Sequence, residues 1–176
     1  MDTRHLRLVP HSPEHLRALI NGRDAYAKSF GVPAAEGFGD FLKNGAAEIS
    51  PAWLARLQTA TVTDVWIDGF AVVHIASNTV IGSGSFKGPP DAKGVVEIAY
   101  GIVPSQQGRG YATEAARALV TYAFGDARVR VVRAHTSPTN EASGRVLTKC
   151  GFTRIAQLDD PDDGPVWRWE LPRASG

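Results

Sequence analysis

The pattern of hydrophobic and polar positions along the chain predicts a strand, then helices, a run of consecutive strands, a helix, a strand, a helix and a final pair of strands. Short apolar runs rich in β-branched residues predict strands at 6–9, 65–75, 80–86, 95–103, 129–136, 152–157 and 166–171. Apolar residues at helical spacing predict helices over 13–20, from 51 onward, over 111–125 and from 141 onward. This order predicts an α/β fold with a mixed, mostly antiparallel sheet of six or seven strands and helices on both faces.

Two of the predicted helices have clear start signals. Ser12-Pro13 and Ser50-Pro51 each place serine at an N-cap and proline at the first helical position. Both residue types are favoured at those positions, because serine accepts a free backbone N–H and proline lacks the N–H that would go unbonded. The first helix is expected to bury Leu16, Leu19 and Ile20.

Other segments are expected to be irregular or to form turns. From 23 to 44, glycines and prolines interrupt the hydrophobic pattern, so no regular element is expected there. Ser77-Asn78 is expected to join the strands on either side of it as a hairpin. The acidic segment 158–165 separates the last two predicted strands. It is interpreted as a solvated hairpin tip, with a metal site as the alternative.

Length, composition and charge restrict the possible functions. A chain of 176 residues suits a single domain over 1–176, and a net charge of +1 argues against a general nucleic-acid binder. The apolar runs are too short to span a membrane, and the N-terminus lacks the apolar core of a signal peptide. The single cysteine, Cys150, is typical of a cytoplasmic protein, and we interpret it as a packed residue in preference to a nucleophile.

A glycine-containing turn follows the strand at 95–103. Its sequence, Gln107-Gly108-Arg109-Gly110-Tyr111-Ala112, leads directly into the predicted helix at 111–125. The first turn of a helix carries N–H groups that lack intrahelical partners and attract anions, and glycine allows an anion to approach the backbone. The turn lacks the Gly-Lys-[Ser/Thr] ending of a P-loop, and Thr113 stands where a dinucleotide fingerprint requires Gly or Ala.

The turn matches a Gln-x-x-Gly-x-Ala pattern, and a second motif follows the next strand. This second motif runs from Asn140 through Ser143 to Lys149-x-Gly-Phe152. Together, in this order, the two motifs resemble the GNAT superfamily of acyl-CoA N-acyltransferases. The segments 110–115 and 146–152 are most similar to the ribosomal-protein N-terminal acetyltransferase branch (RimJ/RimL-like).

The resemblance implies a GNAT-like fold and a cosubstrate, acetyl-CoA, with no metal. Residues 1–60 would supply helices on the acceptor side, and residues 65–172 would supply the sheet and the acetyl-CoA-binding core. The fourth and fifth strands would be splayed, leaving backbone groups that a peptide-like pantetheine arm can satisfy. The residues expected to contact the cofactor are Gly101, Ile102, Val103, Gln107, Gly108, Arg109, Gly110, Tyr111, Ala112, Thr113, Asn140 and Ser143.

The implied activity is direct transfer of an acetyl group to a primary amine. The acceptor would be a protein N-terminus or a small-molecule amine, and the protein would act as a monomer or homodimer without nucleic acid or membrane partners. The alternative is a catalytically silent domain that binds acyl-CoA as a sensor or scaffold. For two of the expected cofactor contacts there is a simpler interpretation: Asn140 can serve only as a helix N-cap, and Arg109 can be only a solvent-facing charge.

The candidate catalytic residues depart from the family pattern, because Leu147 stands where the resemblance implies the usual tyrosine acid. Ser143 or a water molecule is left to protonate the departing thiolate, unless the thiolate leaves unaided. Glu97 is the candidate general base, since it shares a strand face with small residues that leave room for a ligand; the alternative is an exposed strand residue. His74 and His135 are further candidates near the cleft. No Ser-His-Asp spacing indicates an acyl-enzyme mechanism.

Overall fold

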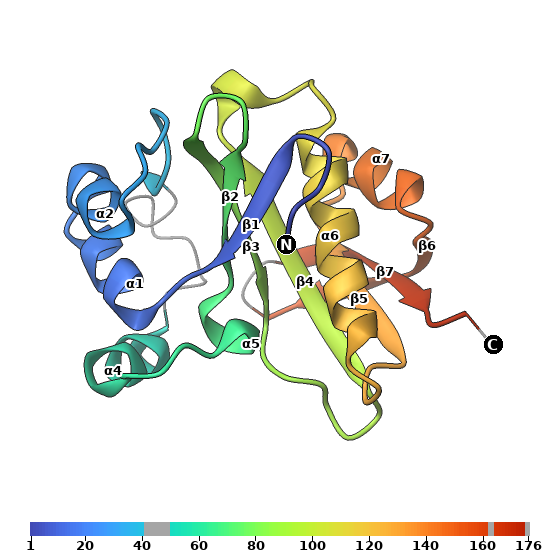
Figure 1. The fold of residues 1–176 in the computed structure, drawn as a ribbon. Helices are drawn as coiled ribbons and strands as arrows, with labels where there is room; N and C mark the ends of the chain where they lie inside the picture. Colours follow the sequence, from blue (N-terminus) through green and yellow to red (C-terminus); the bar gives the residue numbers. More distant parts are fainter. Residues whose placement is uncertain (41–49, 162–163, 175–176) are drawn as a thin grey trace.

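The computed structural model describes residues 1–40, 50–161 and 164–174 (Figure 1). Within these residues the strands are β1 (Leu6–Pro10), β2 (Phe70–His74), β3 (Thr79–Phe86), β4 (Val95–Ile102), β5 (Val131–Thr136), β6 (Thr153–Asp160) and β7 (Gly164–Pro172). The helices are α1 (Pro13–Ile20), α2 (Arg23–Phe30), α4 (Pro51–Thr59), α5 (Val65–Asp68), α6 (Tyr111–Gly125) and α7 (Glu141–Lys149), with a 3-10 turn η1 (Pro104–Gln106).

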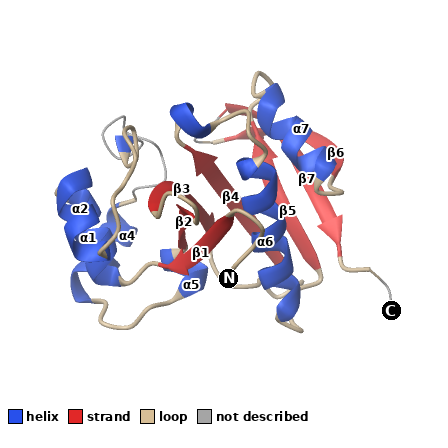
Figure 2. Ribbon diagram, turned by 45° about the horizontal axis from the view of Figure 1, so that its top comes forward, coloured by secondary structure: helices blue, strands red, loops and turns tan. Residues whose placement is uncertain are grey.

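The strands form one seven-stranded sheet in the order β1-β2-β3-β4-β5-β7-β6. β4 and β5 run parallel, and every other neighbouring pair is antiparallel. α6 lies against the sheet, in contact with β1, β3 and β4, and α7 packs beside it. α1, α2 and α4 form a separate group on the side of the molecule away from α7 (Figure 2). The prediction of a mixed, mostly antiparallel α/β sheet is therefore confirmed.

The start signals of α1 and α4 work as predicted. The Ser12 hydroxyl accepts from the His15 N–H, and the His15 ring bonds back to the Ser12 N–H. Ser50 likewise accepts from the Trp53 N–H at 3.1 Å. Leu16 and Leu19 are buried, but the prediction that Ile20 is buried is wrong, because it lies at the last position of α1 with 49% of its surface exposed.

The prediction that 23–44 lacks regular structure is wrong for its first part, which forms α2. The local signal is weak because apolar residues are sparse, and the helix depends on tertiary contacts. Tyr26 is fully buried, stacks on Phe30 and is hydrogen-bonded through its hydroxyl to His11 Nε2 at 2.8 Å. Gly31 ends the helix in the left-handed conformation. Residues 41–49 of the same segment lie outside the described residues.

The predicted strand at 65–75 begins five residues late, because its first part forms the single helical turn α5. Asp64 caps the turn by accepting from the Trp66 N–H, while the buried Asp68 carboxylate accepts from the Asp64 N–H and is paired with Arg56 at 2.6 Å. Gly69 then reverses the backbone at φ 66°. Two aspartates and a glycine thus override the strand preference of the β-branched residues.

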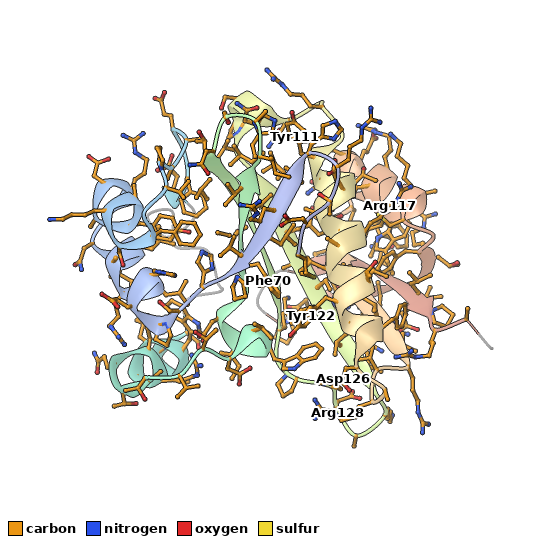
Figure 3. All side chains as sticks on the ribbon, in the orientation of Figure 1. Phe70, Tyr111, Arg117, Tyr122, Asp126 and Arg128 are labelled. Atoms are coloured by element: carbon orange, nitrogen blue, oxygen red, sulfur yellow. The ribbon has the colours of Figure 1, made fainter. Side chains whose placement is uncertain are left out.

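The close approach of α6 to the sheet requires a glycine in β3. A Cβ at Gly84 would lie 3.0 Å from Leu119 Cδ1, and Leu119 is completely buried. Beside this contact, the rings of Phe70 and Tyr122 pack with their centroids 5.3 Å apart (Figure 3). The predicted hairpin is present as the antiparallel pair β2 and β3, with a register shift at Val72/Val73.

The final hairpin is longer than predicted, because strand pairing continues into the acidic segment as far as Asp160 and Gly164. Residues 162 and 163, at the centre of that predicted turn, lie outside the described residues. Within 1–40, 50–161 and 164–174, no cluster of three or more His, Cys, Asp or Glu side chains is arranged to hold a metal ion. None of the helices in these ranges has both the length and the apolar character needed to cross a membrane.

Candidate functional site

The two parallel strands at the centre of the sheet separate after three residue pairs. β4 and β5 pair from Val95 with Val131 to Glu97 with Arg133, and beyond that point β4 pairs only with β3 among the described residues. The second half of β4 therefore presents one line of backbone N–H and C=O groups to an opening between the strands. Such groups are costly to bury without a partner.

The register of β3 and β4 decides which backbone groups face this opening. The Val103 N–H donates to the Ile81 carbonyl, and the Lys87 N–H donates to the Glu97 carbonyl, both at 2.9 Å. Because bonded and non-bonded pairs alternate in an antiparallel ladder, the intervening odd-numbered residues of β4 also bond to β3. The even-numbered residues direct their backbone groups toward β5, and beyond the last β4–β5 pair this leaves Tyr100 and Ile102 facing the opening.

This geometry corrects the expected backbone contacts of β4. Gly101 and Val103 were expected to offer unpaired backbone groups, but Gly101 lies opposite Ser83 in the ladder and the Val103 N–H is bonded to β3. Ile102 keeps an orientation toward the opening, although its carbonyl already accepts from Gln107 Nε2 at 2.8 Å. Gln107 thereby fastens the start of the glycine turn to the end of β4.

The glycine turn has the predicted relation to α6. Gly108 and Gly110 both have positive φ, 74° and 83°, and a Cβ at either would meet no atom within 4 Å. Gly110 is the N-cap of α6 and provides no side-chain cap. Because the turn is exposed and its N-cap has no side chain, the first N–H groups of α6 are open to an anion. Arg109 lies exposed in the same turn.

The next residue, Tyr111, connects this turn to β2. Its hydroxyl is hydrogen-bonded to His74 Nε2 at 3.1 Å, and His74 Nδ1 is bonded to the Ser77 hydroxyl at 2.8 Å. His74 therefore holds the start of α6 in place. The structure does not bring His74 together with Glu97, with which it was grouped as a possible proton acceptor.

The second motif forms the start of α7. Asn140 is the N-cap, and its side-chain oxygen accepts from the Ser143 N–H at 3.1 Å. The Ser143 hydroxyl lies 3.1 Å from the Tyr100 hydroxyl of β4. Leu147, one turn further along, is completely buried in the core. Cys150 is half-buried against the Thr113 carbonyl, and burial raises the pKa of its thiol, which agrees with a packed residue.

Tyr100 is the site residue that sequence reasoning missed. It lies on the same face of β4 as the buried Val96 and Ile98, so alternation along the strand directs it toward the helices. The helix that supplies its partner follows a different strand, and that pairing is not visible in the sequence. Burial raises the pKa of Tyr100 to about 12, only partly offset by its bond to Ser143.

Glu97 lies on the other face of β4, at the point where the strands separate. Its carboxylate contacts Lys87 Nζ at 2.8 Å and His135 Nδ1 of β5 at 3.0 Å. Burial alone would raise the pKa of this carboxyl group, but the hydrogen bonds from His135 and Lys87 outweigh it and lower the pKa. The structure thus brings together Glu97 and His135, two of the predicted candidates.

A second ion pair on β5 and β7 adjoins this group. Arg133 donates from Nε and Nη2 to one oxygen of Glu170, at 2.9 and 2.7 Å, and Arg168 Nε lies 3.6 Å from the same oxygen. Arg133 and His135 are two residues apart on β5, so their side chains lie on the same face of the sheet. That face of the sheet is therefore polar and charged next to Glu97, in contrast to the apolar face under α6.

Sequence comparisons find relatives among N-acetyltransferases. The profile of the "Acetyltransferase (GNAT) domain" matches residues 5–153. An uncharacterized N-acetyltransferase, YjdG of Bacillus subtilis, is 31% identical over 48% of this chain and 51% of its own length. An aminoglycoside N(6')-acetyltransferase type 1 of Klebsiella pneumoniae is 28% identical over 70% of this chain and 62% of its own length. The chain thus spans only about half to two thirds of these relatives.

Solved structures share the fold at low sequence identity. An acetyltransferase of the GNAT family from Bacillus anthracis superposes with a TM-score of 0.63 at 18% identity, over 98% of this chain and 97% of that one. A ribosomal L7/L12 N-terminal acetyltransferase, solved with coenzyme A, gives a TM-score of 0.62 at 17% identity over 97% and 95% of the two chains. The matched profile covers most of the sequence and the sheet opening has the expected form, so this chain belongs to the GNAT acetyltransferase family.

Proposed function

We propose that this chain is an acetyl-CoA-dependent N-acetyltransferase that transfers the acetyl group directly to a primary amine. The observation that carries the proposal is the separation of β4 and β5 beyond Glu97, in the middle of the sheet, where the end of β4 leads into an uncapped helix N-terminus. Coenzyme A has a peptide-like pantetheine arm joined to a diphosphate, so it matches both the strand separation and the helix N-terminus. Its amides can bond to the free backbone groups, and its diphosphate can lie on the turn.

The residues proposed to hold the cosubstrate follow from this geometry. Backbone groups of Tyr100 and Ile102 would bond the pantetheine arm, in place of those expected from Gly101 and Val103. The turn from Gln107 to Thr113 would bind the diphosphate, and the start of α7, at Asn140 and Ser143, would face the arm. Bound acetyl-CoA would supply an activated thioester carbon for attack.

The Glu97–His135 pair is proposed to receive the proton of the acceptor amine. With Glu97 ionised, His135 donates its Nδ1–H to the carboxylate, so the lone pair of a neutral imidazole lies on Nε2. This arrangement gives two routes for the proton: onto Nε2, with Glu97 orienting the ring, or onto the carboxylate directly. Lys87 stabilises the ionised carboxylate in either case.

The acceptor proposed is a protein N-terminus or a small-molecule amine in a cytoplasmic setting. Similar proteins are named for aminoglycosides, and solved neighbours are named for spermidine and ribosomal proteins. The motifs at 110–115 and 146–152 favour the ribosomal-protein branch. Monomer and homodimer remain the two proposed assemblies.

A panel of amines tests the function. Purified protein with acetyl-CoA should release free coenzyme A thiol, measured with a thiol reagent, only when an acceptor is present. The panel should contain N-terminal peptides, polyamines, aminoglycosides and free amino acids. Coenzyme A binding without acyl transfer to any amine would favour the silent acyl-CoA-binding alternative, which the buried Leu147 at the usual tyrosine position supports. Absence of coenzyme A binding would contradict both.

Replacing Gly110 with aspartate should weaken coenzyme A binding at least tenfold, or by about 1.4 kcal/mol. The substitution puts a carboxylate at the helix N-terminus where the diphosphate is proposed to lie. Calorimetry measures the affinity, and circular dichroism checks the fold. Gly31→Asp is the matched control, since Gly31 also has a positive φ, 77°, and open space around it, at the end of α2. Equal affinities in the two variants would contradict the assignment of the turn.

A further inference from the structure

The Tyr100 and Ser143 hydroxyls connect the two sides of the sheet opening. Tyr100 belongs to the part of β4 that has left β5, and Ser143 belongs to the helix that follows β5. Their oxygens are 3.1 Å apart, and either can be the donor. Both side chains are partly buried. A pair of bonded hydroxyls that spans an otherwise unpaired stretch of strand is well placed to contact whatever lies in the opening.

We propose that Tyr100 and Ser143 act as one hydrogen-bonding unit that donates an O–H to the thioester sulfur of acetyl-CoA as that sulfur leaves. The inference rests on the proposed function and adds to it a residue from β4. In this proposal the departing sulfur is stabilised from the face of β4 that is directed toward α6 and α7. Glu97 and His135 serve the attacking amine on the opposite face.

Three observations support this assignment. Leu147 is completely buried and carries no polar atom, so the usual tyrosine position provides no donor to the sulfur. Bonded hydroxyls polarise one another, so the free O–H of a pair is a stronger donor than a single hydroxyl. The Tyr100 phenol is protonated at neutral pH, as any phenol with a pKa near 10 is, and burial raises its pKa further, to about 12. The unit therefore stabilises a thiolate by donating a hydrogen bond while it keeps its own protons.

The step balances without another reactant. The neutral amine nitrogen forms a bond to the acetyl carbon, and the carbon–sulfur bond breaks with its electron pair remaining on sulfur. The amine loses one proton to the Glu97–His135 pair, which returns it to solvent. The thiolate takes its proton from solvent after it leaves. The products are an N-acetyl amide and coenzyme A thiol.

The pKa of coenzyme A thiol bound to the protein tests the proposal without turnover. Ultraviolet absorbance of the thiolate gives this pKa, with the complex of desulfo-coenzyme A subtracted to remove Cys150 and the tyrosines. In the parent protein the bound thiol should titrate below its free pKa of about 8.5. Tyr100→Phe should raise the bound value by about 1–2 pH units, as expected for loss of a hydrogen bond to a charged group. Ser143→Ala should raise it by a similar amount.

The pKa shift in the double variant shows whether Tyr100 and Ser143 act as one unit or as two independent residues. The double variant should shift the thiol pKa no further than either single one, and kcat should fall about tenfold or more in each. Tyr122→Phe and Thr148→Ala are matched controls. Tyr122→Phe removes a phenol hydroxyl near the C-terminal end of α6 (Figure 3). Thr148→Ala removes an exposed hydroxyl that donates to the Gly144 carbonyl of its own helix. Neither should change the pKa of the bound thiol.

Several outcomes would overturn the inference. An unchanged thiol pKa in Tyr100→Phe, with coenzyme A still bound and the amine still acetylated, removes Tyr100 from the reaction and leaves the proposed function intact. Additive shifts in the double variant show two independent contacts. A parent protein that fails to bind coenzyme A overturns this inference together with the proposed function.

Discussion

Replacing Glu97 with glutamine is expected to lower kcat/KM for a basic primary amine by about 10²–10³-fold. An amine attacks only when it is neutral. A lysine-like amine with a pKa near 10.4 is neutral in only about one part in 2,500 at pH 7, a handicap of about 4.6 kcal/mol. Glutamine keeps the size of the side chain but neither accepts a proton nor holds His135 with the same charge.

The effect should depend on the basicity of the acceptor. An α-amino group has a pKa near 7.7–8.0 and needs less help, so its loss should be about tenfold. Coenzyme A affinity should stay the same, because Glu97 faces away from the proposed cofactor contacts of Tyr100 and Ser143. The lowered pKa of Glu97 keeps its carboxylate ionised well below neutral pH, so its own titration should not shape the profile at neutral and alkaline pH.

Profiles of kcat/KM against pH, with one acceptor of each kind, measure these effects. Glu170→Gln is the matched control, since it removes a carboxylate charge from β7, where Glu170 accepts from Arg133, while His135 contacts Glu97. A parallel His135→Gln variant separates the two routes for the proton. If it matches Glu97→Gln, the proton goes to Nε2; if it is much milder, the carboxylate is the base. Should Glu97→Gln track the parent for both acceptors, Glu97 is an ordinary strand residue.

Replacing Leu147 with alanine is expected to reduce the free energy of unfolding by about 2–5 kcal/mol. Leu147 is completely buried in the hydrophobic core, and its truncation to alanine leaves a cavity there. The prediction matters for function because other family members place their catalytic tyrosine at this position. In this chain the position is expected to contribute to stability and not to the chemical step.

Denaturant unfolding measures this loss, and turnover of the folded variant is measured well below its melting temperature. Leu147→Met conserves volume and should cost less than about 1.5 kcal/mol. Thr148→Ala, at the exposed neighbouring position, should change stability by no more than about 0.5 kcal/mol. A stable Leu147→Ala protein with altered turnover would instead place this residue in the site.

Local chemistry made several elements predictable. The caps at Ser12, Ser50 and Asn140 depend on one side chain and the N–H groups within three residues of it, so the sequence is enough to locate them. The glycine turn at the start of α6 is equally local. The errors occurred where distant contacts decide: α2 depends on the burial of Tyr26, and α5 depends on the pairing of Asp68 with Arg56.

The sequence by itself determined the family, the α/β class and the turn that is proposed to hold a diphosphate, because each rests on residues that are neighbours along the chain. Only the tertiary structure decided which backbone groups of β4 face the opening, since that depends on its register with β3. It also decided the partners of the reactive side chains. Glu97 meets His135, and Tyr100 meets Ser143, across the separation of β4 and β5. These contacts join residues from different strands and helices, so no spacing in the sequence encodes them.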